Sequence, residues 1–173
     1  MDDIRFENEY LRTKDTLKEA YRYWYFRRPI AIAIYAVAAF NILLNIGLLI
    51  MELPVSLVNI FLVIFISALY PLLYFIQVNS AAKKDSQICH GQEMRACITV
   101  TADRFYPNRA DGDIYIDFSS VNYAYETKNY IILVMKSTRL MLIFHKNGFT
   151  VGDFDGFVAF LRERGIKIKG KLK

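Results

Sequence analysis

The sequence predicts an α+β membrane protein, in which a hairpin of two transmembrane helices is joined to a small antiparallel β domain closed by a C-terminal helix. Glu52 is the only charged residue between Pro29 and Val78, although charged residues make up 23% of the 173-residue chain. After Gln92, apolar and polar residues alternate with the period of β-strands. Near the end of the chain, apolar residues recur at helical spacing, at Phe154, Phe157, Val158, Phe160 and Leu161. These patterns exclude a fully soluble globule, a disordered chain and a disulfide-rich mini-protein.

Residues 1–28 are expected to form a cytoplasmic strand and an amphipathic juxtamembrane helix. Apolar and polar residues alternate over Asp3–Leu11, which indicates a short strand. A helix is expected to begin near Lys14, and one of its faces is apolar: Leu17, Ala20, Tyr21, Trp24 and Tyr25. Its last turn is aromatic and basic, so we expect Arg27 and Arg28 to lie near the phosphates of lipid headgroups.

Residues 29–78 are expected to form the transmembrane hairpin. The runs Ile30–Met51 and Pro54–Val78 each exceed the roughly 20 apolar residues that a spanning helix needs. Only Glu52 and Leu53 separate the runs, which predicts a tight turn, with Pro54 in the first turn of the second helix.

The orientation of the hairpin follows from the basic residues at its ends. Arginines precede the first run and lysines follow the second, at Arg22, Arg27, Arg28, Lys83 and Lys84, whereas the tip carries one acid and no base. Because basic residues stay on the cytoplasmic side, both termini are predicted to be cytoplasmic. In that reducing compartment Cys89 and Cys97 are expected to be free thiols.

Three amides interrupt the apolar runs: Asn41, Asn45 and Asn59. Asn41 and Asn45 are four residues apart and share a helix face. Folding the hairpin about its tip brings Asn45 near the depth of Asn59. We favour hydrogen bonding that packs the hairpin. The alternative is a polar seam used by a partner span or a conducted solute.

Residues 79–173 are expected to form a cytoplasmic β domain with a C-terminal helix and a basic tail. The stretch 79–92 extends the second helix by a few turns. Short strands are predicted over 94–100, 104–107, 113–118, 121–125, 130–135 and 140–144, with a hairpin turn at Asp111-Gly112. A helix over Asp153–Arg164 ends at Gly165. This order matches a pleckstrin-homology-like (PH-like) fold, to which the N-terminal strand would add a seventh strand.

No pattern of residues predicts catalysis, a cofactor or a metal. Cys89, His90 and Cys97 fall one short of the four ligands of structural zinc, and His145 is the only distant fourth candidate. Polar residues around Asp111 lack the spacing of a calcium loop. Ser119 and Ser120 lack the glycines of a nucleophile elbow. The chain is therefore expected to be non-enzymatic.

The C-terminal tail is basic, with Lys167, Lys169, Lys171 and Lys173 alternating with apolar residues or glycine. Three interpretations compete: attraction to anionic lipid, non-specific binding of nucleic acid, and a solvated tail that protects a sheet edge or aids solubility. Nucleic acid is disfavoured because aromatic residues are not interleaved with the lysines. Lipid ranks above nucleic acid because the chain is expected to sit at a membrane.

Several segments together resemble the YcxB-like family of bacterial membrane proteins. They are the helix entry over Tyr10–Tyr25, the two-span hairpin, Ile98–Tyr106, Ile116–Val121, Tyr130–Ile132 and Phe149–Leu161. Phe118 stands where the family usually has Trp, and the family's Pro near His145 is missing. The resemblance implies this architecture and a location in the bacterial inner membrane, and it supplies no catalytic residue.

The leading prediction is a non-enzymatic inner-membrane protein whose PH-like module binds a protein partner or anionic lipid at the cytoplasmic face. The alternatives are an immunity or resistance factor against a membrane-acting toxin, and an accessory subunit of a transporter or signalling complex. The expected partners are membrane lipids and either a protein or further copies of the chain.

Overall fold

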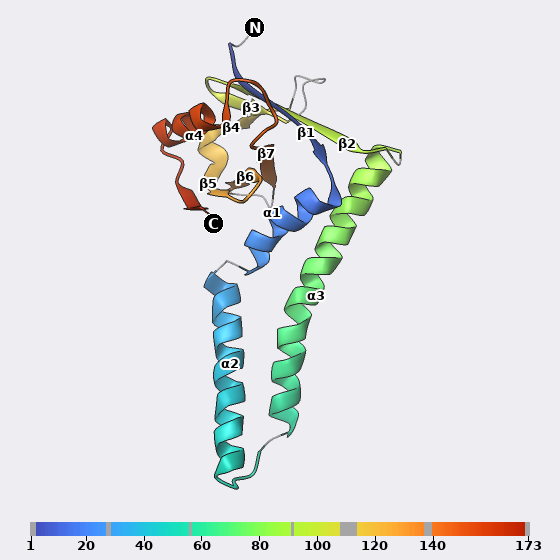
Figure 1. Cartoon of the computed structure of the whole chain (residues 1–173), viewed down its shortest axis with the longest axis vertical. Helices are drawn as coiled ribbons and strands as arrows, with labels where there is room; N and C mark the ends of the chain where they lie inside the picture. The colour runs from blue at the N-terminus through green and yellow to red at the C-terminus, as the bar shows by residue number, and fades with distance from the viewer. Residues whose placement is uncertain are drawn as a thin grey trace. The chain divides into compact units, whose positions relative to one another are not determined.

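The computed structural model describes residues 3–26, 29–55, 57–90, 92–107, 114–136 and 140–171 (Figure 1). The chain divides into two compact units. A β unit comprises Met1–Thr13 and Ile88–Lys173, and a helical unit comprises Lys14–Gln87. The strand and the helix that we predicted within residues 1–28 therefore belong to different units.

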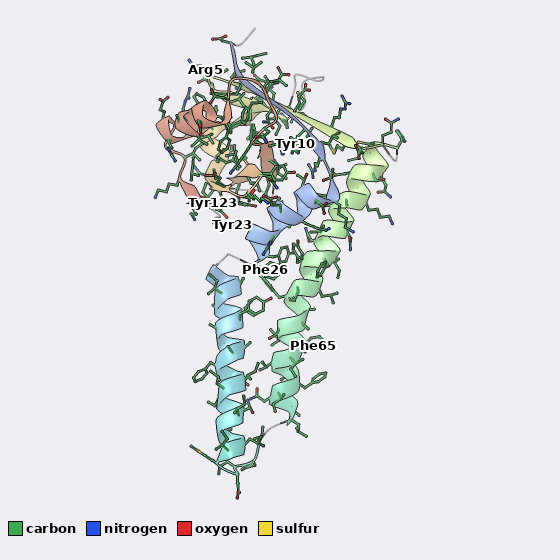
Figure 2. The ribbon with its side chains drawn as sticks, viewed as in Figure 1. Arg5, Tyr10, Tyr23, Phe26, Phe65 and Tyr123 are labelled. Atoms are coloured by element: carbon green, nitrogen blue, oxygen red, sulfur yellow. The ribbon has the colours of Figure 1, made fainter. Side chains whose placement is uncertain are left out.

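The helical unit contains α1 (Lys14–Phe26), α2 (Pro29–Ile50) and α3 (Leu57–Ile88). Both α2 and α3 are long and apolar enough to cross a membrane, and only 6% of their most apolar windows is buried. Apolar side chains such as Phe65 project outward from α3 (Figure 2). The core helix of a soluble domain would instead bury such side chains. As predicted, α3 continues past Val78 by several turns.

The prediction for Pro54 was wrong, because α3 begins at Leu57 and Pro54 lies in the connection. The end of α2 explains the longer link. The N–H of Leu53 donates to the carbonyl of Leu48 at 2.9 Å, and Glu52 adopts a left-handed φ of 56°. This turn ends α2, and it involves Glu52 and Leu53, the two residues that we expected to form the entire link between the helices. The chain therefore needs further residues to reverse its direction before α3 begins.

Helix α1 packs on the part of α3 that follows Pro71. Leu17, Tyr74 and Val78 are buried together, and the hydroxyl of Tyr74 donates to the carbonyl of Lys18 at 3.1 Å. Leu17 and Ala20, from the predicted apolar face of this helix, are 2% and 0% exposed. The apolar face of α1 is therefore buried within the helical unit.

The β unit contains two sheets. The first has the order β4-β3-β2-β1-β8, and the second has the order β7-β6-β5-β9. Neighbouring strands are antiparallel except β5 and β9. The strands of the first sheet are β1 (Ile4–Arg12), β2 (Met94–Thr101), β3 (Arg104–Tyr106), β4 (Ile116–Asp117) and β8 (Phe149–Val151). Those of the second are β5 (Val121–Glu126), β6 (Tyr130–Met135), β7 (Met141–His145) and β9 (Ile168–Lys171).

Helix α4 (Phe154–Glu163) fills the space between the sheets with the apolar residues that predicted it. Phe157, Val158, Phe160 and Leu161 join a core drawn from both sheets. The Asp153 carboxylate accepts a hydrogen bond from the Gly156 N–H at 2.7 Å, which caps the helix. Gly165 ends it with φ of 73°, as predicted.

Three predictions about strands need correction. The short strand β8 was missed. The strand expected over 113–118 is reduced to β4, followed by a 3₁₀ turn over Phe118–Ser120, and the turn at Asp111-Gly112 lies outside the described residues. The basic tail, in which no strand was predicted, forms β9 as far as Lys171, because Ile166 is buried and Ile168 packs on the core.

Candidate functional site

Residues of the β unit line a basic cavity of about 470 Å³. Three cationic side chains line it, and they come from three separate segments: Lys136 after β6, Arg164 after α4 and Lys167 before β9. The Ser119 hydroxyl and the Asn122 amide add polar groups to its wall. No carboxylate is found among the described residues that line it.

Backbone hydrogen bonds fix the two lysines of this cavity. The Lys136 N–H donates to the carbonyl of Ser120 at 2.8 Å, and the Lys167 carbonyl accepts from the N–H of Ala124 at 2.9 Å. Both side chains remain exposed. The ammonium groups are therefore available to an anionic ligand while their backbone stays in place.

Arg164 is held more tightly than the two lysines. Its guanidinium donates to the Ala102 carbonyl, lies 3.5 Å from the Asp103 carboxylate, and stacks over the rings of Phe118 and Phe160. These contacts make Arg164 a fixed wall of the cavity. Sequence analysis did not connect Lys136 with Arg164 and Lys167, because Lys136 lies much earlier in the chain.

The other basic residues of the sequence prediction lie elsewhere. Lys169 is exposed on β9, and its ammonium is 4.2 Å from the centroid of the Tyr123 ring, a residue labelled in Figure 2. The side chain of Lys171 and all of Lys173, Arg27 and Arg28 lie outside the described part of the chain. Of the two tail lysines whose side chains are described, Lys167 lines the basic cavity and Lys169 does not.

The three predicted amides come together between α2 and α3. The Asn45 amide donates to the Asn41 carbonyl at 2.7 Å and to the Asn41 side-chain oxygen at 2.8 Å. The Asn41 amide donates to the side-chain oxygen of Asn59 at 3.4 Å. The cross-helix bond therefore comes from Asn41 rather than from Asn45. Asn41 and Asn45 border a cavity of about 230 Å³ that is otherwise lined by aliphatic side chains.

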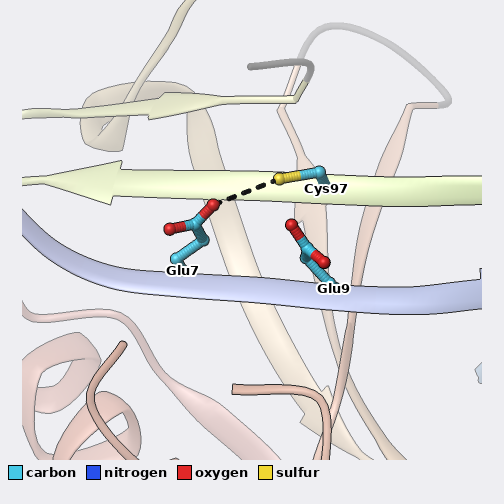
Figure 3. Close-up of side chains that lie close together, drawn as sticks. All are labelled: Glu7, Glu9 and Cys97. Carbon is cyan, nitrogen blue, oxygen red and sulfur yellow. Dashed lines mark hydrogen bonds between the residues drawn. The ribbon is translucent and has the colours of Figure 1, made fainter. Parts of the chain in front are cut away.

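A third cluster, which sequence analysis missed, joins Glu7, Glu9 and Cys97 (Figure 3). One ligand atom from each side chain lies within 4.8 Å of the others, and the Cys97 Sγ is 3.6 Å from Glu7 Oε1. In the described chain this is the one group of three or more His, Cys, Asp or Glu side chains so placed. Cys89, His90 and His145 are not part of it.

Burial and the two neighbouring carboxylates favour the protonated form of the Cys97 thiol. Burial first, and then the charges and hydrogen bonds of Glu7 and Glu9, raise the pKa of Cys97 to about 11. A thiol with this pKa is a poor nucleophile at neutral pH, because thiolate is the reactive form. The cluster is therefore unsuited to thiol catalysis, whereas its sulfur and oxygen atoms are the donors of a metal site.

Comparisons with known proteins add no family assignment. No protein-family model matches the chain, and no curated protein matches it either. The resemblance to YcxB-like proteins stays a prediction that rests on the residues quoted above.

Proposed function

We propose that this chain is a non-enzymatic protein of the bacterial inner membrane whose cytoplasmic PH-like module binds the phosphate groups of anionic lipids. The observation that carries the proposal is the basic cavity of Lys136, Arg164 and Lys167. Lysine and arginine are the side chains that bind phosphate, and arginine adds a planar, directional donor. A cavity with three cations and no described carboxylate favours an anionic ligand.

The architecture supports a location where such lipids are present. Two helices are suited to a membrane, and α3 leads within a few residues into β2 of the β unit. The basic residues beside the two runs favour cytoplasmic termini, and the inner face of the membrane carries anionic lipid. Tethering raises the effective concentration of a lipid surface, so individually weak contacts suffice.

The assignment to the PH-like class rests on the arrangement of the β unit. Antiparallel strands form two sheets, and a helix late in the chain fills the space between them. Strand β9 follows that helix and pairs parallel to β5. This strand is an addition to the order of elements that the sequence predicted.

Native mass spectrometry of the full chain in a neutral detergent tests the proposal. The protein is titrated with phosphatidylglycerol and, in parallel, with phosphatidylcholine. Phosphatidylglycerol should bind more tightly, and the preference should weaken as salt rises, because the Debye length falls from about 10 Å at 0.1 M to about 3 Å at 1 M.

Two variants connect that preference to the cavity. Lys136→Gln and Lys167→Gln should each reduce the binding of phosphatidylglycerol by about fivefold, which corresponds to about 1 kcal/mol per basic residue. Lys128→Gln, which removes an exposed lysine outside the cavity, is the matched control and should have no effect. Equal binding of the two lipids, or equal losses in all three variants, would contradict the proposal and direct attention to a protein partner.

A further inference from the structure

We propose that Glu7, Glu9 and Cys97 form a binding site for a divalent cation of the zinc type, with water completing its coordination. The proposal is independent of lipid binding, since none of these residues lines the basic cavity. It rests on the spacing of the three donors, on the strands that hold them, and on a buried hydroxyl beside them.

The donor atoms are already near the spacing that zinc requires. Zinc binds carboxylate oxygen at about 2.0 Å and thiolate sulfur at about 2.3 Å, so in a tetrahedral site the two ligands stand about 3.5 Å apart. The Cys97 Sγ and Glu7 Oε1 are 3.6 Å apart. The third donor, from Glu9, lies within 4.8 Å of both. Glu9 is exposed, so a rotamer change can close the remaining distance.

The backbone beneath the cluster is held on both sides. Glu9 pairs with Cys97 and Glu7 pairs with Thr99, in the antiparallel register of β1 and β2. Each of these strands has a second neighbour, β8 for β1 and β3 for β2. Glu7 and Glu9 are two residues apart, so they share one face of the sheet, as Cys97 and Thr99 do. The fold therefore presents the ligands before any cation binds.

A buried hydroxyl provides the independent indication of a ligand. Thr99 is 6% exposed, and its Oγ1 has no hydrogen-bond partner among the residues that the structure describes. It lies on the same face as Cys97 and directly opposite Glu7. A buried polar atom without a partner is costly and needs an explanation. A water bound to a cation at this cluster would donate a hydrogen bond to Thr99 Oγ1, as second-shell groups commonly accept from metal ligands.

The donor set decides which cations fit. Calcium and magnesium prefer oxygen ligands alone, whereas zinc accepts thiolate together with carboxylate. Binding converts the Cys97 thiol to a thiolate, and its proton passes to solvent. The site then holds three negative charges around a doubly charged ion. Because protons compete for the sulfur, affinity should fall as the pH is lowered.

Cobalt and zinc test the site in the full chain, purified in detergent without a histidine tag. Cobalt(II) added at pH 8 should bind in a one-to-one ratio and give the near-ultraviolet charge-transfer band of a cobalt–thiolate bond. Zinc should abolish that band by displacing cobalt, and its binding should release about one proton from the thiol.

Variants identify the ligands. Cys97→Ser should remove the cobalt–thiolate band, and Cys89→Ser, which removes the other free thiol, should leave it unchanged. Glu9→Gln should keep the fold, because Glu9 is exposed, and weaken zinc binding by about tenfold or more. The proposal is wrong if the unmodified protein binds neither ion in a one-to-one ratio, or if the band survives in Cys97→Ser.

Discussion

The side chain of Asn8 is expected to contribute more to the stability of the β unit than any surface amide. It is 0% exposed and forms two hydrogen bonds with the backbone of His145. Its amide donates to the His145 carbonyl at 2.8 Å, and its oxygen accepts from the His145 N–H at 3.0 Å. His145 lies on β7, the outer strand of its sheet, and Asn8 lies on β1 of the other sheet. A side-chain amide thus takes the place of a neighbouring strand and joins the two sheets.

The variant Asn8→Leu measures this contribution. Leucine has a similar size, but it leaves the N–H of His145 without the partner that Asn8 provides, whereas the His145 carbonyl still accepts from the Gly148 N–H at 3.0 Å. Each unsatisfied group costs about 1–3 kcal/mol. The β unit should therefore lose about 1–3 kcal/mol, out of the roughly 5–15 kcal/mol that stabilises a typical domain.

Amide hydrogen exchange is the suitable assay, because a chain with two units has no single unfolding free energy. Peptides from β6, which is buried along its whole length, should exchange about fivefold faster or more in Asn8→Leu. Peptides from α3 serve as the internal reference. Asn122→Leu, which replaces an exposed amide on β5, should change the β6 rate by less than threefold. If β6 in Asn8→Leu also changes by less than threefold, the two hydrogen bonds do not hold the sheets together.

Two further predictions concern the helical unit. A reporter fused before Met1, or one fused after Lys173, should be active only in the cytoplasm, as the basic residues beside the hairpin require; activity at either end outside the cell would contradict the topology. Replacing Asn41, Asn45 and Asn59 by Leu should leave membrane insertion intact and weaken the packing of α2 on α3 by about 0.6–2 kcal/mol per lost hydrogen bond. Thermal unfolding of the helices in detergent would measure the loss, and an ion flux that depended on the amides would instead favour a conducting role.

The elements that the sequence predicted correctly carry their signal locally. Helix α2 could be predicted from the apolar composition of its own residues alone. Helix α4 could be predicted from the helical spacing of its apolar residues, from Asp153 at its start and from Gly165 at its end. In each case the decisive residues lie within one element, so a short window of sequence contains them.

The features that were missed depend on pairings between distant segments. No strand was predicted in the basic tail, because the alternation of its lysines with isoleucine and glycine could not be connected to a strand that would pair with it. Its parallel partner β5 lies more than forty residues earlier in the chain. Cys97 likewise lies 90 residues from Glu7. The acids and the thiol could be found only once the register of β1 and β2 was known.

That register also constrains the helical unit. Strands β1 and β2 pair from Ile4 opposite Thr101 to Arg12 opposite Met94, so they form a hairpin whose connection is the whole helical unit. Paired residues of antiparallel strands lie about 4.5–5.5 Å apart. The chain must therefore leave and return at one place, and only an even number of membrane crossings permits this. The pairing of β1 with β2 constrains the topology independently of the basic residues and agrees with two spans. With α2 and α3 as membrane spans, deletion of either helix would place β1 and β2 on opposite sides of the membrane, and the first sheet would lack the interior strand that supplies Glu7, Asn8 and Glu9.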